Sequence, residues 1–402
     1  MNKKDAIEIL RKEVEIPDAV REKADAALAQ IQSSRAGQRG KVLPYNQASR
    51  PRKRSRKRVV LISAAAVASL FALTGAAAVY RNWSRSLSEG LHVSEEQKQE
   101  LESNQMAAFA EQSCTDNGIT VTAQQSITDN YYSHLSFKVE GYDLEEGAEP
   151  AFETISITVD GRDDFSWSGS FYNGVISDEY GRPALADGSS WESLETDENG
   201  VLIQPSYVMK DGSLEFQVTL AKTDEKGFFL NKPVHVELTN LGTVARAEYS
   251  PVLEGSWTFD WNLQGSGEAK EYDLNVPLGD SGAAVTHAEI SPISLTAEYQ
   301  FPRQEITDQY TDENGEIQEY TLYEEPPALM GVRLKDGTSY PYLYMGPGSM
   351  GYKDESSDTY VYSFAIDRVL DPEQVECLLF LKEVPEGDGA LEEASFYEVP
   401  LQ

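Results

Sequence analysis

The chain has 402 residues and a net charge of −33, and its charge is divided unevenly. Residues 1–58 contain 16 basic and 7 acidic residues, a net charge of +9, whereas residues 81–402 contain 18 basic and 60 acidic residues, a net charge of −42. Its two cysteines are too few for a disulfide framework, which excludes a small secreted fold held together by such bonds.

Residues 1–35 are expected to form a short cytoplasmic helical segment. One helix opens with the capping-box pattern Asp5-x-x-Glu8, and a second has Pro17 in its first turn, where the missing N–H does no harm. Two such helices bury little apolar surface alone, so we expect their apolar stripes to bind a cytoplasmic partner. A hairpin that packs on itself or lies on the membrane is the alternative. The predicted partner-binding residues are Ile7, Leu10, Val14, Val20, Ala24, Leu28 and Ile31.

Residues 36–58 form a basic linker that leads into an uncharged apolar segment at 59–80. That segment is long enough to cross a hydrocarbon core of about 30 Å, so we predict one transmembrane helix. A cleaved signal peptide is the alternative, although such peptides lie within the first ~15–30 residues of a chain. The basic cluster that precedes the segment consists of Arg50, Arg52, Lys53, Arg54, Arg56, Lys57 and Arg58.

This basic cluster predicts the orientation of the chain in the cell membrane. Lys and Arg remain on the cytoplasmic side and attract anionic lipid headgroups. We therefore expect a single-pass protein with a cytoplasmic N-terminus and an extracytoplasmic C-terminus. Because the membrane already accounts for the cluster, a nucleic-acid-binding arm is not needed, and no nucleic-acid partner is expected.

Residues 81–113 are predicted to be a membrane-proximal linker and helix. The pattern Ser94-x-x-Gln97 is a capping box, which places the start of the helix there. We expect this helix to end near Gln112.

From Gly118 onward, apolar and polar residues alternate with the period of β-strands. Short strands without long helical patterns between them predict a mainly β fold with two extracytoplasmic antiparallel β-sandwich (Ig-like) domains. Since the strand-rich region is longer than one sandwich requires, we divide it into residues 114–267 and 268–402. The pairs Asp160-Gly161, Asp187-Gly188, Asp211-Gly212, Asp336-Gly337 and Asn314-Gly315 suit tight hairpin turns, and the last of them predicts a protruding acidic hairpin.

Few sequence patterns indicate catalysis or metal binding. The string GDSG at 279–282 surrounds the nucleophile of chymotrypsin-like proteases, but the upstream His134 and His235 lie in the middle of predicted strands. The remaining histidines, His92 and His287, are isolated, and no zinc-ligand spacing occurs. We therefore predict a protein that is not an enzyme, with no catalytic residues, metal, cofactor or small-molecule substrate.

Cys114 and Cys377 both belong to the predicted extracytoplasmic part, where oxidising conditions permit a disulfide. Such a bond would tie the start of the first β domain to the end of the second. Two cysteines do not make a framework, so we favour free thiols over this bond, although the sequence does not decide between the two states.

Four stretches of the chain resemble one family of proteins. They are EIPDAVREKADAALAQIQ at 15–32, DNGITVTAQQSITDNYYSHLSFKVEG at 116–141, GSWTFDW at 255–261 and AEISPISLTAEY at 288–299. They resemble single-pass, anti-sigma-factor-like membrane proteins of Gram-positive bacteria, which have an extracytoplasmic β domain of unknown function. These proteins are encoded beside extracytoplasmic-function sigma factors.

The resemblance implies that residues near 1–35 bind a cytoplasmic sigma factor. It also implies that the outer domains sense a signal or stabilise the protein. It supplies no catalytic residues. The chain lacks the His-x-x-x-Cys-x-x-Cys pattern of zinc-containing anti-sigma domains, so the two apolar stripes would provide a different contact surface. The alternative function is a cell-surface adhesin or wall-binding protein, with Phe165, Trp167, Phe171 and Tyr172 as a ligand face or, equally, as core strand residues.

Overall fold

The structure is a computed structural model that describes residues 83–145, 147–189, 194, 206–245, 248–311, 317–343, 346–354, 356–383 and 394–401. The predicted cytoplasmic segment at 1–35, the basic linker at 36–58 and the transmembrane helix at 59–80 lie outside these residues. Within the described part, neither α-helix, α4 (Arg85–Gly90) or α5 (Glu95–Ser103), has the length and apolar character to span a membrane.

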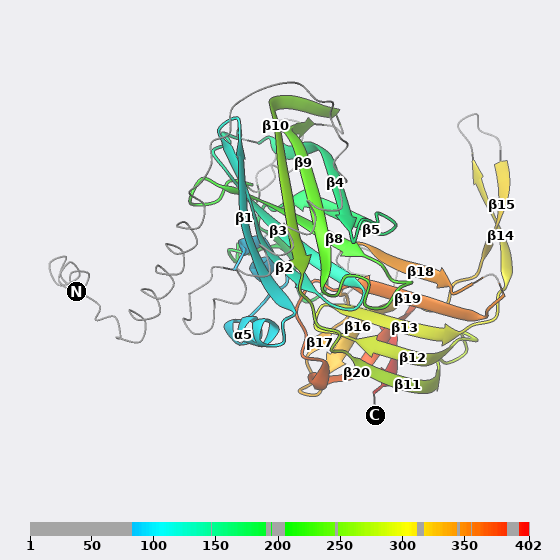
Figure 1. The fold of residues 1–402 in the computed structure, drawn as a ribbon. Coiled ribbons are helices and arrows are strands. Elements are labelled where there is room, and N and C mark those ends of the chain that lie inside the picture. Colours follow the sequence, from blue (N-terminus) through cyan, green and yellow to red (C-terminus); the bar gives the residue numbers. More distant parts are fainter. Residues whose placement is uncertain are drawn as a thin grey trace, which may run out of the picture. The chain divides into compact units, whose positions relative to one another are not determined.

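The first hydrophobic core lies between two antiparallel sheets. One sheet has the strand order β1-β2-β3-β8-β5, and the other has the order β10-β9-β4. We call this pair of sheets the first sandwich (Figure 1). Its strands are β1 (Ala107–Asp116), β2 (Ile119–Thr128), β3 (Tyr132–Glu140), β4 (Glu149–Val159), β5 (Ser166–Phe171), β8 (Leu214–Ala221), β9 (Lys232–Ala245) and β10 (Glu248–Leu263).

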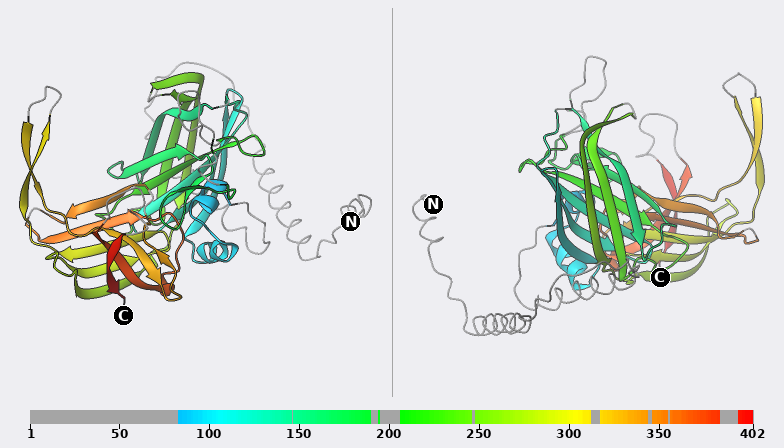
Figure 2. Two further views of the ribbon diagram at one scale, coloured as in Figure 1. Left: turned by 180° about the vertical axis from the view of Figure 1, so that it is seen from behind. Right: turned by 45° about the horizontal axis from the view of Figure 1, so that its top comes forward.

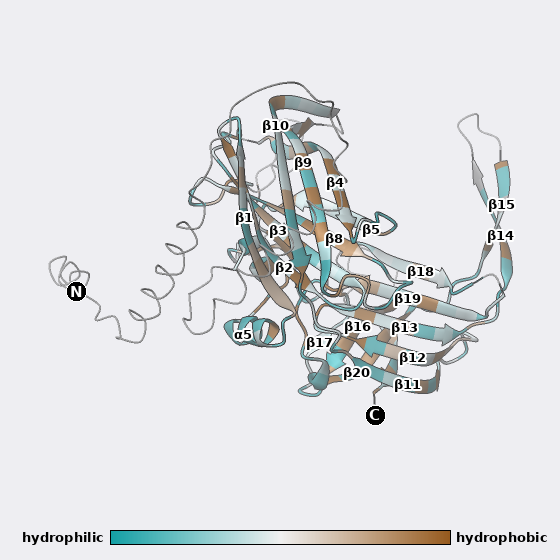
Figure 3. Cartoon of the chain, viewed as in Figure 1, coloured by the Kyte–Doolittle hydropathy of each residue, from teal (hydrophilic) through white to brown (hydrophobic). Residues whose placement is uncertain are grey.

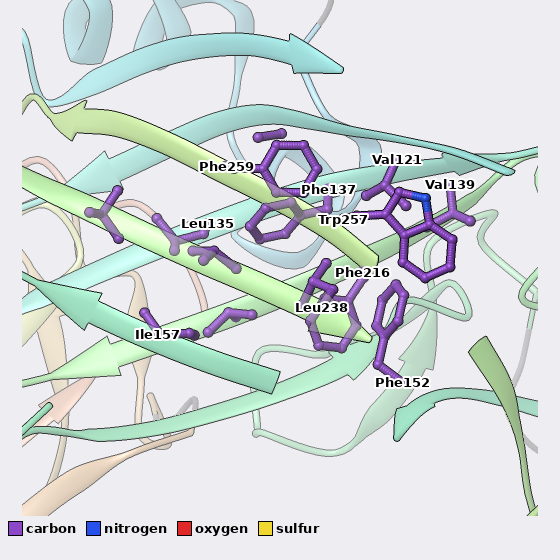
Figure 4. Close-up of a cluster of buried hydrophobic side chains, with 14 of the residues drawn as sticks. Val121, Leu135, Phe137, Val139, Phe152, Ile157, Phe216, Leu238, Trp257 and Phe259 are labelled. Carbon is purple, nitrogen blue, oxygen red and sulfur yellow. The ribbon is translucent and has the colours of Figure 1, made fainter. Parts of the chain in front are cut away.

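Aromatic side chains join the two sheets of the first sandwich. The ring of Phe137 on β3 lies 5.6 Å from that of Phe259 on β10, measured between centroids (Figure 4). Trp257 is fully buried, and its indole N–H donates to the carbonyl oxygen of Ile119 at 3.1 Å. The stretch GSWTFDW therefore supplies core residues of this sandwich.

A second hydrophobic core lies between two further antiparallel sheets, with the orders β11-β12-β13-β19-β18 and β17-β16-β20-β21. Tyr299 and Phe380 meet across these sheets with their ring centroids 5.5 Å apart. The strands of this second sandwich are β11 (Lys270–Pro277), β12 (Ala284–Ile290), β13 (Ser294–Gln300), β16 (Leu329–Leu334), β17 (Ser339–Tyr340), β18 (Gly348–Tyr352), β19 (Thr359–Ala365), β20 (Val375–Glu383) and β21 (Ser395–Pro400). A short 3-10 helix, η2 (Pro372–Gln374), precedes β20.

Two separate hairpins complete the described elements. One joins β6 (Val175–Ser177) to β7 (Pro183–Leu185). The other joins β14 (Glu305–Thr311) to β15 (Ile317–Tyr323) and extends from the second sandwich (Figure 2). It is the predicted acidic hairpin, although its turn at 312–316 lies outside the described residues.

The prediction of a mainly β fold built from antiparallel strands is confirmed. Burial alternates along β11, and Figure 3 shows apolar and polar residues interspersed along the strands. Asp160 and Gly161 both have positive φ, 52° and 77°, which is the conformation of a type I′ turn.

The prediction that the membrane-proximal helix continues to Gln112 is wrong. Its capping box is present, but α5 ends at Ser103, because Gln105 takes a left-handed conformation with φ 59°. The Met106 N–H donates to the Leu101 carbonyl and the Gln105 N–H donates to the Glu102 carbonyl, which is a Schellman motif. Residues 107–112 instead begin β1, where Ala107, Ala108 and Phe109 are all buried.

Candidate functional site

The predicted partner-binding residues and the basic cluster cannot be placed in a site, because all of them lie outside the described residues. Of the aromatic residues considered as a ligand face, Phe171 and Tyr172 are buried, and Phe165 packs against Phe228 and Phe229. Only Trp167 is exposed, at 39%. These side chains therefore do not form a common exposed face.

The best-defined polar site is the junction where the two sandwiches meet. It is built from two turns, TDNY at 128–131 between β2 and β3 and SPI at 291–293 between β12 and β13. The sequence alone gave no sign that they contact each other, because they are more than 150 residues apart.

Asp129 is the centre of the junction. Its carboxylate, 1% exposed, accepts hydrogen bonds from the backbone N–H groups of Tyr131 and Tyr132 at 2.8 and 2.7 Å. It also accepts from the hydroxyls of Ser291 and Ser294, the latter at 2.5 Å. Burial raises the pKa of Asp129 above its usual value, and these four bonds oppose that shift by stabilising the ionised form.

Glu289, next to Asp129, also links the two sandwiches. Its carboxylate, in β12, accepts from the Asn130 amide at 2.7 Å and from the Tyr131 hydroxyl at 3.2 Å. The ammonium group of Lys226 lies 2.8 Å from Glu289 and 2.5 Å from Glu271. Both carboxylates of the second sandwich are thereby held by groups of the first.

An apolar cluster continues the junction, and we call it the junction cluster. It contains helix residues together with residues of both sandwiches, all buried. Tyr132 is one of them, and its hydroxyl lies 3.1 Å from that of Ser363. The junction cluster consists of Leu87, Leu91, Val93, Leu101, Met106, Ala107, Ile127, Tyr132, Ala221, Ile293, Ala365 and Val369.

The helices α4 and α5 are bonded to both sandwiches. The buried carboxylate of Glu215, on β8, accepts from the N–H groups of Arg85 and Ser86 at 3.0 and 2.5 Å, where the first turn of α4 leaves them unpaired. On the side of the second sandwich, the N–H of Val369 donates to the Leu91 carbonyl at 2.8 Å. The Gln97 amide in turn donates to the Val369 carbonyl at 2.9 Å. The segment at 83–106 is therefore part of the junction.

The GDSG string lies in the turn between β11 and β12. The Ser281 hydroxyl oxygen accepts from the N–H of Ala283 at 3.2 Å, and the Ser281 N–H donates to the Leu278 carbonyl at 3.1 Å. His134 is 1% exposed and contacts the Thr219 hydroxyl at 3.0 Å, while His235 contacts Asp260 at 2.9 Å. The serine thus contributes to the turn, and these two histidines bond elsewhere.

Cysteine thiols and metal-ligand side chains are the other groups that could carry chemistry. Cys114 and Cys377 are both free thiols. In the part of the chain that the structure describes, no group of three or more His, Cys, Asp and Glu side chains is arranged to hold a metal ion.

Comparisons with known proteins yield one structural similarity. No protein-family model matches the chain, and no curated protein does. The chain is similar to the crystal structure of a conserved domain protein from Bacillus anthracis, with 13% sequence identity and a TM-score of 0.38. That similarity covers 74% of this chain and 87% of the other.

Proposed function

We propose that the chain is a single-pass membrane regulator of the anti-sigma-factor-like type. Residues 1–35 bind a sigma factor on the cytoplasmic side, and the two sandwiches sense a signal on the other side of the membrane. In this proposal the stripe residues Ile7, Leu10, Val14, Val20, Ala24, Leu28 and Ile31 lie against the sigma factor. Each fully buried apolar side chain contributes up to about 1.5–3 kcal/mol to such a complex.

The observation that carries this proposal is the position of α4 in the junction. Only residues 81–84 separate the predicted transmembrane segment from Arg85, the first residue of α4. The helix is held by Glu215 of the first sandwich and, through Leu91, by Val369 of the second. A signal that changes the junction therefore acts directly on the segment that enters the membrane.

The sequence supports the same proposal through its charge. The basic cluster and the acidic outer part lie on either side of the apolar segment at 59–80, as expected for a protein with a cytoplasmic N-terminus. Release of the sigma factor would follow from a conformational change or proteolysis after the signal.

The experiment that tests sigma-factor binding uses the full-length chain, tagged and purified from membranes. The double variant Leu10→Asp/Leu28→Asp places a charge in each apolar stripe, and we expect it to lose the captured sigma factor. The matched control is Lys12→Asp/Gln30→Asp, which adds the same side chains on the opposite helix faces. Mass spectrometry that finds equal capture by both double variants would refute the proposed contact surface.

A further inference from the structure

The strand β18 has an open hydrogen-bonding edge. It is the terminal strand of its sheet, and in the described structure it pairs only with β19. The N–H of Lys353 donates to the Thr359 carbonyl at 2.9 Å. Because hydrogen-bonded pairs alternate in an antiparallel ladder, Gly351 and Ser349 also face β19. The backbone groups of Gly348, Met350 and Tyr352 consequently point toward the open edge.

A cavity of about 500 Å³ lies along one face of β18. Tyr323, Tyr352 and Tyr360 line it, together with Met350, whose side chain is 59% exposed. The Arg303 guanidinium covers the Tyr352 ring at 4.3 Å. We call this space the tyrosine cavity, and it offers aromatic surface to the aliphatic stem of a long side chain.

A second hollow, of about 470 Å³, adjoins β18 and includes residues of its other face. Ser349 and Lys353, which alternate with Met350 and Tyr352 along the strand, line it together with Glu298 of β13 and Thr223 of the first sandwich. Asp224 and Lys226 also line it, and Met350, Gly351 and Tyr352 border both spaces. An added Cβ at Gly351 would meet no atom within 4 Å, so the strand is accessible at this point. We call this hollow the polar groove.

The surroundings of the tyrosine cavity are acidic. Between Phe301 and Glu325 the described residues include five acidic ones, Glu305, Asp308, Glu319, Glu324 and Glu325, and one basic one, Arg303. Glu325 and Asp354 line the cavity itself. Such a surface attracts positively charged partners and disfavours acidic ones.

We propose that the open edge of β18 binds an extended basic peptide segment, which adds to the sheet as a further strand. The peptide backbone pairs with the free N–H and C=O groups of Met350 and Tyr352. Its side chains point alternately to the two faces, so every second one enters the tyrosine cavity and the others lie over the polar groove. The lysine or arginine residues of the peptide are the ones that enter the tyrosine cavity, where their charged ends lie beside Glu325 and Asp354.

This binding site goes beyond the proposed regulatory function and does not depend on it, since peptide binding concerns only the described sandwiches. A second copy of the chain is the other strand-adding occupant, but its strongly acidic surface opposes that arrangement. Charge therefore favours the basic peptide.

The test measures fluorescence anisotropy of a labelled basic peptide, KVKYKVKYK, with the purified full-length chain in detergent. We expect saturable binding that weakens with added salt, and binding at least tenfold weaker for the acidic peptide EVEYEVEYE. N-methylation of alternate peptide residues removes donors from one edge of the peptide only. Methylation can be placed at the odd-numbered or at the even-numbered residues of the peptide. One of these two patterns should weaken binding about tenfold, and the other should leave it nearly unchanged.

Two variants at a single residue separate the strand edge from the side chain. Met350→Pro removes an N–H that points to the open edge, where proline is tolerated, and should weaken binding about tenfold. Met350→Ala keeps the N–H and should bind within about threefold of the unchanged protein. Thermal unfolding of both variants checks that they fold.

Three binding results would overturn the inference. They are no saturable binding, equal binding of the basic and acidic peptides, and equal effects of both methylation patterns on the unchanged protein. Dimers in sedimentation that Met350→Pro dissociates would assign the edge to a second copy instead, which also contradicts the proposal.

Discussion

The carboxylate of Asp129, in the turn before β3, accepts a hydrogen bond from the hydroxyl of Ser294, at the start of β13, at 2.5 Å. The two residues are 165 positions apart and belong to different sandwiches. Asp129 also accepts from two N–H groups of its own turn, so one buried carboxylate holds both the local turn and the contact between sandwiches. Several properties of the protein are expected to depend on it.

Replacement of Asp129 by asparagine should destabilise the described region by about 2–4 kcal/mol. The amide has only one acceptor oxygen, and its NH₂ group would face N–H and O–H donors that now point to a carboxylate. Urea unfolding measures this change. The matched control is Asp273→Asn, because the Asp273 side chain is fully exposed, and its unfolding free energy should stay within about 0.5 kcal/mol. Equal effects of the two variants would contradict the role of Asp129.

Replacement of Leu91 by alanine should also destabilise the junction, by about 2–5 kcal/mol. Leu91 is fully buried in the junction cluster, so the shorter side chain leaves a cavity among residues of both helices and both sandwiches. Val252→Ala removes apolar atoms from a side chain that is 61% exposed and should have little effect. Urea unfolding of the two variants in parallel measures the difference. A decrease in the free energy of unfolding of less than about 1 kcal/mol for Leu91→Ala would indicate that α4 is not tightly packed.

His134 should make stability depend on pH. Burial lowers its pKa to about 4 in the folded state, compared with about 6.5 for an exposed histidine. The unfolded chain therefore binds the proton more readily, and the free energy of unfolding should fall as the pH decreases from about 6.5 to 4. The full effect of this one residue is about 3 kcal/mol.

The measurement compares urea unfolding at several pH values between the unchanged protein and His134→Gln. The variant should lose this part of the pH dependence. Val252→Ala serves as the control because it changes an exposed side chain without removing a titratable group, and it should keep the pH dependence of the unchanged protein. If His134→Gln retained the same slope, the assignment to His134 would be wrong.

Local patterns in the sequence predict the strands well, and physical reasons explain the exceptions. The Asp160-Gly161 turn and the Ser94 capping box depend on neighbouring residues, so the sequence predicts them directly. The strand β1 escaped prediction because Ala107, Ala108 and Phe109 are buried in succession, without alternation, and a register shift follows between Phe109 and Gln112. The strand β18 is short and contains two glycines, which are poor strand formers.

The candidate sites depend on contacts that no local pattern contains. Asp129 looks like an ordinary turn residue until Ser291 and Ser294 are placed beside it, and Met350 looks like a loop residue until β19 is placed beside it. The available signal was the turn-forming residues, Asp129 and Asn130 in one turn and Ser291 and Pro292 in the other. That signal gave the residues but not their proximity.

The most direct test of the central claim is a comparison of transcripts in cells that contain the full-length chain, no chain, or the chain without residues 1–45. We expect the shortened chain, although present in the membrane at normal amounts, to give the same transcript changes as complete removal. Those changes should be concentrated in the genes of one sigma factor. Transcripts that match the full-length cells would contradict a regulatory role and favour an adhesin or wall-binding protein.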